Sequence, residues 1–283
     1  MTHPGTSLRE QLWSPVQNST LWLGWWLHGL LSTDDLIDAF QDVQGPAHVL
    51  RTDPAADDPF DGRLDGRLGQ AGSRPTGLVD LFHAVREVTR DAPVGLTERP
   101  LVGLALAGAG DPPPLPAGSN GAVAVTETGA GITVADPDPD VTHVVVPRVL
   151  DRSLVEWTWY RCEGRGVPAP VLGPGDADRM LRDATDRAAG LVAASGTPTV
   201  RHTAPRLAVG ALSDAFGLPG LPPGVSTRAA KLMARADVVA SIIEVTRSSS
   251  AGAGLDPMLL PLSRAVRTAR TTAVDHAMRE LLR

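Results

Sequence analysis

Tryptophan is concentrated at the N-terminal end of this chain. Four of the six tryptophans fall in one short stretch, in a protein with only one tyrosine and four phenylalanines: Trp13, Trp22, Trp25 and Trp26. Between Leu21 and Leu31 the only residues that are not hydrophobic are Gly24, His28 and Gly29. A helix over this segment is apolar around its whole circumference, so every side of it must be covered. The cover is either the rest of the chain or a second copy.

Composition limits the available chemistry. The chain has 283 residues, 42% of them hydrophobic, which suits one large or two modest globular domains. Its one lysine, Lys231, follows Ala229 and Ala230, so the Gly-Lys-Ser/Thr run of a phosphate-binding loop is absent. The single cysteine, Cys162, excludes an intrachain disulfide and a cysteine-rich zinc site.

The same features predict a location. A single cysteine fits a reducing cytoplasm. The Trp-rich run is about half as long as a membrane-spanning helix, and the segment before it carries Arg9 and Glu10 without the basic start of a secretion signal. We therefore expect a cytoplasmic protein with no membrane partner.

Charge is distributed unevenly. From Arg201 onward there are eleven Arg/Lys against six Asp/Glu, so this part carries a net charge of +5. The whole chain carries -6, so the first 200 residues carry -11. The acidic and basic parts either face each other or the basic part has an anionic partner.

Helical patterns occupy the N-terminal third. The Trp-rich helix is expected over residues 20–31. Ser32 is a natural N-cap for a second helix, because Asp34 and Asp35 then lie in its first turn, and the apolar stripe Leu36, Ile37, Phe40 and Val43 follows. A helical hairpin results. Residues 51–76 are rich in Pro, Gly, Asp and Arg, and a further helix is expected over residues 78–88.

Strand patterns occupy the centre, and helical patterns return after them. Strands are expected over residues 101–106, 123–125, 132–134, 144–146 and 155–162, with the second and third as a hairpin. In the last of these, Trp157 and Trp159 share one face. Helices are expected from Asp176 to about Leu191, from Ser226 to about Ile243, and from about Leu262 after Pro261.

These patterns predict an α+β protein with an N-terminal helical hairpin, a central, mostly antiparallel sheet of about five strands and a C-terminal helical bundle. We expect an α+β domain over residues 1–172, in which residues 51–76 form a disordered loop or linker. A helical domain is expected over residues 173–283.

Three segments carry a resemblance. The run LVGLALAGAGDPPPLPAG, the strand that contains Trp157, and the run LPPGVSTRAAKLMARADVV resemble a family of uncharacterised soluble proteins of high-GC actinobacteria. The resemblance implies a cytoplasmic protein of such a bacterium and brings no activity with it.

Two motifs resemble ligand sites but lack the context of one. Asp34, Asp35 and Asp38 in DDLID have the spacing of an aspartate-rich magnesium-diphosphate motif, and DDPFD repeats it at Asp57, Asp58 and Asp61. Helix-cap charge and a solvated loop explain them better, because carboxylates without convergent partners do not hold a metal. Gly108 and Gly110 follow a strand, but Pro112, Pro113 and Pro114 prevent the helix that a dinucleotide needs. We expect no metal and no cofactor.

Histidines and arginines supply the remaining candidates. The seven histidines lack metal-ligand spacing, and His28 in the Trp-rich helix is either a switch or ligand or, more commonly, a neutral core residue. Two helix faces carry basic side chains that suit phosphates: Arg228, Lys231 and Arg235, and Arg264, Arg267 and Arg270. No aromatic side chains are interleaved with them, which favours a solvated or internally paired face.

The sequence therefore favours a non-enzymatic cytoplasmic protein that acts through protein–protein association, as a homodimer or with another protein. Trp22, Trp25 and Trp26 are the predicted partner-binding residues, because tryptophan is enriched at interface hot spots. Three alternatives stay open: the Trp-rich helix fills the core, the arginine-lined helices bind nucleic acid, or dispersed residues form an enzyme site that one sequence does not reveal.

Overall fold

The computed structural model describes most of the chain. The described residues are 14–56, 59–60, 62, 64, 77–150, 154–164, 166, 172–194, 205–247 and 252–282. In chain order the elements are α2 (Ser14–Leu27), α3 (Thr33–Gln44), β1 (Ala47–Thr52), α4 (Leu78–Thr89), β2 (Val102–Leu106), α5 (Asn120–Thr128), β3 (Ala130–Ala135), β4 (Val141–Val149), β5 (Leu154–Glu163), α6 (Pro174–Ala194), α7 (Pro205–Phe216), α8 (Thr227–Arg247) and α9 (Gly252–Glu280).

The N-terminal helical hairpin is formed by α2 and α3. Ser32 caps α3, because its hydroxyl accepts from the amide of Asp35 and the Asp35 carboxylate accepts from the Ser32 amide in return. The Trp-rich helix starts at Ser14 and ends at Leu27, earlier at both ends than the predicted 20–31. Gly29, whose φ is 73°, lies in the turn that follows.

The sheet has five strands in the order β1-β5-β4-β3-β2. All neighbours are antiparallel except β1 and β5, which are parallel, so the prediction of a mostly antiparallel sheet of about five strands is confirmed. The registers place Leu50 of β1 beside Trp157 of β5, and Val145 of β4 beside Trp159. The two tryptophans therefore share one face, as predicted for this strand.

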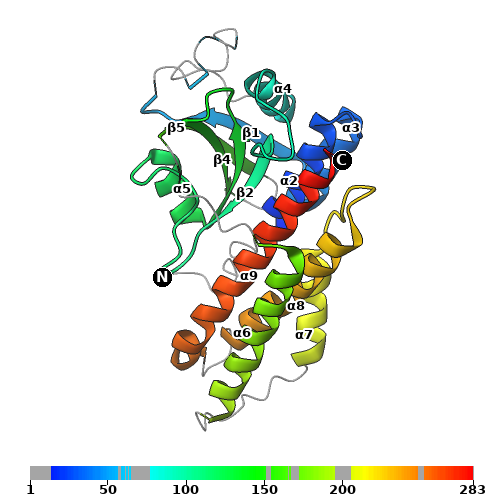
Figure 1. Cartoon of the computed structure of the whole chain (residues 1–283), viewed down its shortest axis with the longest axis vertical. Coiled ribbons are helices and arrows are strands. Elements are labelled where there is room, and N and C mark those ends of the chain that lie inside the picture. The colour runs from blue at the N-terminus through cyan, green and yellow to red at the C-terminus, as the bar shows by residue number, and fades with distance from the viewer. Residues whose placement is uncertain are drawn as a thin grey trace.

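Each face of the sheet has its own core. The face of Trp157 and Trp159 joins the main core, where Phe40 of α3 and Phe82 of α4 pack edge to face with ring centroids 5.1 Å apart. The opposite face carries a smaller core under α5. Helix α5 approaches closely, because a Cβ on its Gly121 would meet the sulfur of Cys162. Figure 1 shows α5 and α4 on different sides of the sheet.

One expected strand was assigned incorrectly, and one observed strand was not expected. Residues 123–125 lie in the helix α5, which begins after the cap Ser119, so the predicted hairpin with residues 132–134 is wrong. The fifth strand is instead β1, which the sequence did not predict. It begins two residues after Gly45 and includes Arg51 and Thr52, so these two residues belong to the sheet and not to the predicted linker.

More of the predicted linker is packed. Asp53 and Phe60 are buried, and the ring centroids of Phe60 and Trp159 lie 5.1 Å apart. Leu64 is buried as well. Residues 65–76 of the linker prediction lie outside the described residues.

The C-terminal helices α6, α7, α8 and α9 form the predicted bundle. Helix α7 was not predicted, and α9 starts at Gly252 and contains Pro257 and Pro261, earlier than the predicted start at Leu262. In Figure 1 the helix α9 runs from the lower part of the bundle up to the side of α2. It packs against α2 and β2 there, so it joins the bundle to the sheet. Within the described residues no helix is long and apolar enough to cross a membrane.

Candidate functional site

One face of α2 carries a stripe of side chains that donate hydrogen bonds. Asn18, Trp22 and Trp25, called the donor stripe below, lie at i, i+4 and i+7 and so share a face of the helix. Opposite them runs the loop from α7 to α8, residues 217–225, called the strap below. Three bonds join the two: Asn18 Nδ2 to Leu218 O at 2.7 Å, Trp22 Nε1 to Gly220 O at 3.1 Å and Trp25 Nε1 to Pro223 O at 2.7 Å.

The strap lies at the surface of the molecule. Leu218 is 53% exposed, and Gly217, Pro223 and Gly224 are exposed too. Leu221 is partly buried and packs against the main core. The strap bends at Gly220 and Gly224, whose φ angles are 94° and 85°. Pro222 is buried, and Val225 is partly buried and packs against the main core like Leu221. The strap is therefore held to the rest of the chain by its carbonyl groups and by these three side chains.

The other sides of α2 are covered by the rest of the chain. Trp26 packs on Phe82 of α4 with ring centroids 5.7 Å apart, and the guanidinium of Arg86 lies 3.9 Å from its ring centroid. The Trp26 indole N–H donates to Thr33 Oγ1 at 3.1 Å. Trp26 thus belongs to the contact between α2, α3 and α4.

These contacts bury the tryptophans of α2 within the single chain, Trp25 and Trp26 almost completely and Trp22 in part. Trp25 and Trp26 are 3% and 4% exposed in the single chain, and Trp22 is partly buried. The chain itself therefore covers the Trp-rich helix, which was one of the two alternatives. A second copy is not needed to bury it, so the partner-binding prediction for Trp22, Trp25 and Trp26 loses its original reason.

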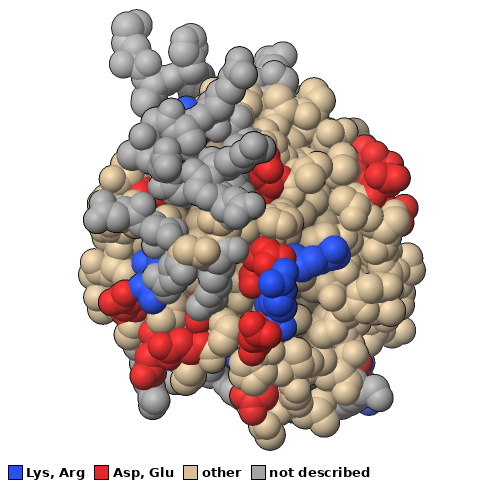
Figure 2. All heavy atoms as spheres, turned by 90° about the horizontal axis from the view of Figure 1, so that it is seen from above, with Lys and Arg blue, Asp and Glu red and all other residues tan. Residues whose placement is uncertain are grey.

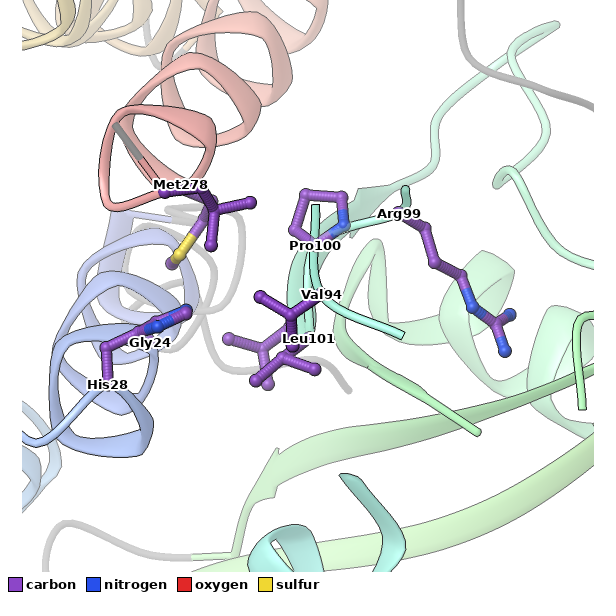
Figure 3. Close-up of a pocket in the computed structure, with 9 residues that line it drawn as sticks. Gly24, His28, Val94, Arg99, Pro100, Leu101 and Met278 are labelled. Atoms are coloured by element: carbon purple, nitrogen blue, oxygen red, sulfur yellow. The ribbon is translucent and has the colours of Figure 1, made fainter. Parts of the chain in front are cut away.

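A small pocket lies at the end of α2 beside α9. Gly24 and His28 of α2, Met278 of α9 and the segment from Val94 to Val102 contribute to its lining (Figure 3). A Cβ on Gly24 would meet Met278 Sδ and Cε, so glycine allows the two helices to approach closely at this point. The pocket volume is about 10 Å³. A volume of that size holds about one water molecule.

The polar groups at this pocket are His28 and Arg99. Burial lowers the pKa of His28 from its ordinary value of 6.5, so the neutral ring is favoured. Arg99 turns its guanidinium away from the pocket (Figure 3) and donates to Thr142 Oγ1 at 3.0 Å and to Asp138 O at 2.8 Å. The polar side chain that borders the pocket is therefore His28. It is half-buried, whereas the core histidine considered from the sequence would be fully buried.

Two buried tryptophan–histidine pairs lie in the main core. Trp157 Nε1 donates to His48 Nδ1 at 3.0 Å, and Trp159 Nε1 donates to His143 Nδ1 at 2.9 Å. His143 Nε2 lies 3.0 Å from Asp136 Oδ2. Nothing in the sequence beyond the alternation of the tryptophans indicates these pairs, because His48 lies in β1 and His143 in β4. Each ring nitrogen has a partner, so the pairs serve as core polar networks.

The arginine helices are engaged within the chain to different degrees. On α8, Arg228 and Lys231 are exposed, while Arg235 pairs with Asp178 of α6. On α9, Arg264 and Arg267 both approach Asp111, with nitrogen–oxygen distances of 3.5 and 2.9 Å.

Asp111 belongs to the tight turn from Gly108 to Asp111, where a Cβ on Gly108 would meet the Arg267 guanidinium. Gly108 and Gly110, for which the sequence argued against dinucleotide binding, therefore form a turn that receives an arginine.

Arg270 is the most buried of these cations. Its Nη2 donates to Asp237 Oδ1 at 2.8 Å, and its guanidinium lies 5.3 Å from the centre of the Phe216 ring. Burial raises the pKa of Asp237 to about 6, against the opposing effect of Arg270. Arg270 therefore does not belong to an open basic face. On the face of the molecule seen from above in Figure 2, basic side chains lie directly beside acidic ones.

The carboxylates do not form a metal centre among the described residues. Asp35 is engaged in the cap of α3, Asp34 and Asp38 are exposed, and no group of three or more His, Cys, Asp or Glu side chains there is arranged to hold a metal ion. Asp57, Asp58 and Asp61 lie outside the described residues.

Fold and site together define a class: an α+β protein whose mixed sheet is joined by α9 to a helical bundle, with a Trp-bearing helix at the junction. Two family models match this chain. One describes the N-terminal domain of Rv1486c-like proteins and matches residues 18–172, and the other describes the C-terminal domain and matches residues 175–271. The chain belongs to the Rv1486c-like protein family. No curated protein and no solved structure matches it.

Proposed function

We propose that this protein acts without catalysis, by binding another polypeptide through the donor stripe of α2. The observation that carries the proposal is the set of three hydrogen bonds from one helix face to the backbone carbonyls of the strap. A surface that binds backbone carbonyls recognises the main chain of an extended segment, and side-chain pockets add specificity.

The types of side chain in the donor stripe support this function. Tryptophan combines a large apolar area with one N–H donor, which is why it is frequent at binding hot spots. Trp22 is only partly buried under the strap, so part of its ring already borders solvent. The original prediction named Trp22, Trp25 and Trp26; the proposal keeps the first two and replaces Trp26, which faces α4, with Asn18.

A second copy of the chain meets the same requirement. Each copy carries one donor stripe and one strap. If two copies exchanged straps, the strap of each copy would make the same hydrogen bonds to the donor stripe of the other, and a homodimer would result. The homodimer that the sequence suggested is therefore one form of the proposed association.

The nucleic-acid alternative has less support than this association. Four of its six predicted cations form ion pairs inside the chain, while Arg228 and Lys231 are exposed: the four are Arg235, Arg264, Arg267 and Arg270. We place the protein in the cytoplasm of a high-GC actinobacterium, on the single cysteine and on the ratio of one lysine to 25 arginines among 26 basic residues. The division into an α+β domain, 1–172, and a helical domain, 173–283, is likewise our proposal.

The experiment that tests this function is a selection of random linear peptides displayed on phage against the purified protein. Selected peptides are then measured on the Trp22→Phe variant, which keeps an aromatic ring but loses the indole donor. We expect weaker binding by about fivefold, as for the loss of one hydrogen bond. Trp26→Phe is the matched control, because its donor bonds Thr33 and not the strap.

Two results would contradict the proposal. Either no selected peptide responds to Trp22→Phe more than to Trp26→Phe, or every selected peptide still binds after Asn18→Ala and Trp22→Phe are combined. Circular dichroism of each variant checks that the fold is retained.

A further inference from the structure

The strap is rich in proline. Its sequence from residue 217 to residue 225 is GLPGLPPGV, with Pro219, Pro222 and Pro223. Proline has no backbone N–H, so three of the nine residues of the strap present a carbonyl acceptor and no donor. The strap is thus an acceptor-rich and donor-poor segment.

The donor stripe has the complementary chemistry. An indole has a donor and no acceptor, so Trp22 and Trp25 can only donate to the strap. Asn18 also presents its donor, because its Nδ2 bonds the strap, while its Oδ1 accepts from Gln17 Nε2 at 3.2 Å. Every polar group that the stripe turns to the strap is therefore an N–H, and every group it meets is a carbonyl.

We infer that the donor stripe is a recognition surface for proline-rich segments of other proteins, and that the strap is its built-in occupant. This inference rests on the proposed function and names the chemistry of the partner. A proline-rich segment fits because its carbonyls lack competing N–H groups of their own and because it loses little conformational freedom on binding.

The strap has the features of a removable occupant. The segment of the chain before it ends in Phe216, which is buried and whose carbonyl lies 3.4 Å from Asn18 Nδ2. The Arg270 guanidinium lies near the Phe216 ring, so α7 stays anchored at this point. Beyond Phe216 the strap is exposed at Gly217, Leu218, Pro223 and Gly224. Movement of the strap, with Leu221, Pro222 and Val225 leaving their packing, would uncover the donor stripe and leave α7 and α8 in place.

The strap is also an inhibitor of the surface it covers. Because it is part of the same chain, its effective concentration at the stripe is in the millimolar range or higher, and a free peptide must compete with it. The wild-type protein should therefore bind a proline-rich partner weakly, and a protein with a weakened strap should bind it more tightly.

The test uses a fluorescein-labelled peptide with the sequence of residues 217–225. The protein is the full chain with residues 218–223 replaced by Gly and Ser at unchanged length, which keeps α7 and α8 connected. By fluorescence anisotropy we expect this variant to bind the peptide at least about tenfold more tightly than wild type. Adding Trp22→Phe should weaken binding about fivefold, while Trp26→Phe should leave it unchanged.

A second peptide separates this inference from the proposed function. In it, the three prolines are replaced by alanine. If the two peptides bind equally well and both respond to Trp22→Phe, polypeptide binding at the stripe stands and the preference for proline is overturned. If neither peptide binds the folded variant, both the inference and the proposed function fail.

A measurement on the wild-type protein covers the case in which the Gly/Ser variant does not fold. Excess peptide should displace the strap and speed hydrogen exchange at the amides of Gly220 and Val225, which are hydrogen-bonded within the strap. The alanine peptide at the same concentration should not. Unchanged exchange with the proline peptide would overturn the inference.

Discussion

Two groups of tryptophans in this protein use the same donor for different purposes. Trp157 and Trp159 of β5 donate to the ring nitrogens of His48 and His143, at 3.0 and 2.9 Å, inside the main core. Trp22 and Trp25 of α2 donate to the backbone of a surface loop. The acceptor differs, and so does the depth at which it lies.

The acceptor determines how replaceable the contact is. A histidine acceptor in the core depends on one particular side chain, and its Nδ1 accepts only when the ring is neutral and carries its proton on Nε2. A backbone carbonyl is offered by every residue, so the strap contact requires a path of the main chain and not a particular side chain. The β5 pairs are therefore fixed parts of the fold, whereas the α2 contacts suit an exchangeable segment.

The largest difference between the two groups should appear on truncation. Trp157 is 1% exposed, so Trp157→Ala should destabilise the protein by about 3–5 kcal/mol, with the His48 nitrogen left without its donor. Trp22→Ala should cost about 1–2 kcal/mol, because part of that side chain is already in water. Urea unfolding monitored by circular dichroism measures both, and equal losses would show that the two groups are equally integral to the fold.

Hydrogen exchange should separate the strap from β5 without any mutation. The amides of Gly220 and Val225, which bond Gly217 O and Pro222 O inside the strap, should exchange through a local opening that low urea concentrations do not affect. The amides of Trp157 and Trp159 should exchange only through global unfolding, because their strand lies between β1 and β4. Strap amides that exchange as slowly as those of β5 would mean that the strap does not open independently.

The elements that the sequence predicted are those whose pattern is local. The alternation around Trp157 and Trp159 and the cap of Ser32 with Asp35 depend on neighbours in the chain, and both appear as predicted. Alternating valines predict a strand over residues 123–125, but Val125 and Ala122 pack on the sheet as one helix face. Packing of this face against the sheet, with Gly121 close to Cys162, favours the helix over the strand.

The candidate site depended on contacts between distant segments. The sequence showed that the Trp-rich helix needs a cover, but the strap that supplies it is 198 residues away from Trp22. In the same way, the parallel pairing of β1 with β5 joins His48 to Trp157 across 109 residues. Such pairings have no local signal, because the sequence pattern of a short strand or of a proline-rich loop does not depend on which distant segment it contacts.

A pH titration should show that the His48 acceptor in the core is sensitive to acid. Burial lowers the pKa of His48 from 6.5, so the unfolded chain binds a proton more readily than the folded one. The stability that neutral His48 provides is fully present above pH 6.5 and is lost as the pH falls from 6.5 towards the folded-state pKa. His48→Gln keeps an acceptor for Trp157 but does not titrate, so its stability should fall less steeply over this range.

His28→Gln is the comparison variant for this titration, and its stability should also fall less steeply than that of wild type. Burial lowers the pKa of His28 too, but the histidine borders the pocket and makes no bond to a tryptophan. Groups with raised pKa values, such as Asp237, are common to all three proteins, so their contribution cancels in the comparison. A slope for His48→Gln identical to that of wild type would show that protonation of His48 does not limit stability in acid.

The smallest expected effect concerns the side of α2 that faces α9. In Gly24→Ala the new methyl group meets Met278 Sδ and Cε, which would cost about 1–3 kcal/mol if nothing moved. Two effects reduce this cost: Met278 is flexible, and alanine favours the helix over glycine by about 1 kcal/mol. We expect a net loss near 1 kcal/mol in thermal unfolding. In a Met278→Ala background the clash is removed, so Gly24→Ala should become stabilising. A loss that persists in that background would mean that the backbone of α2 at Gly24, and not its contact with α9, requires glycine.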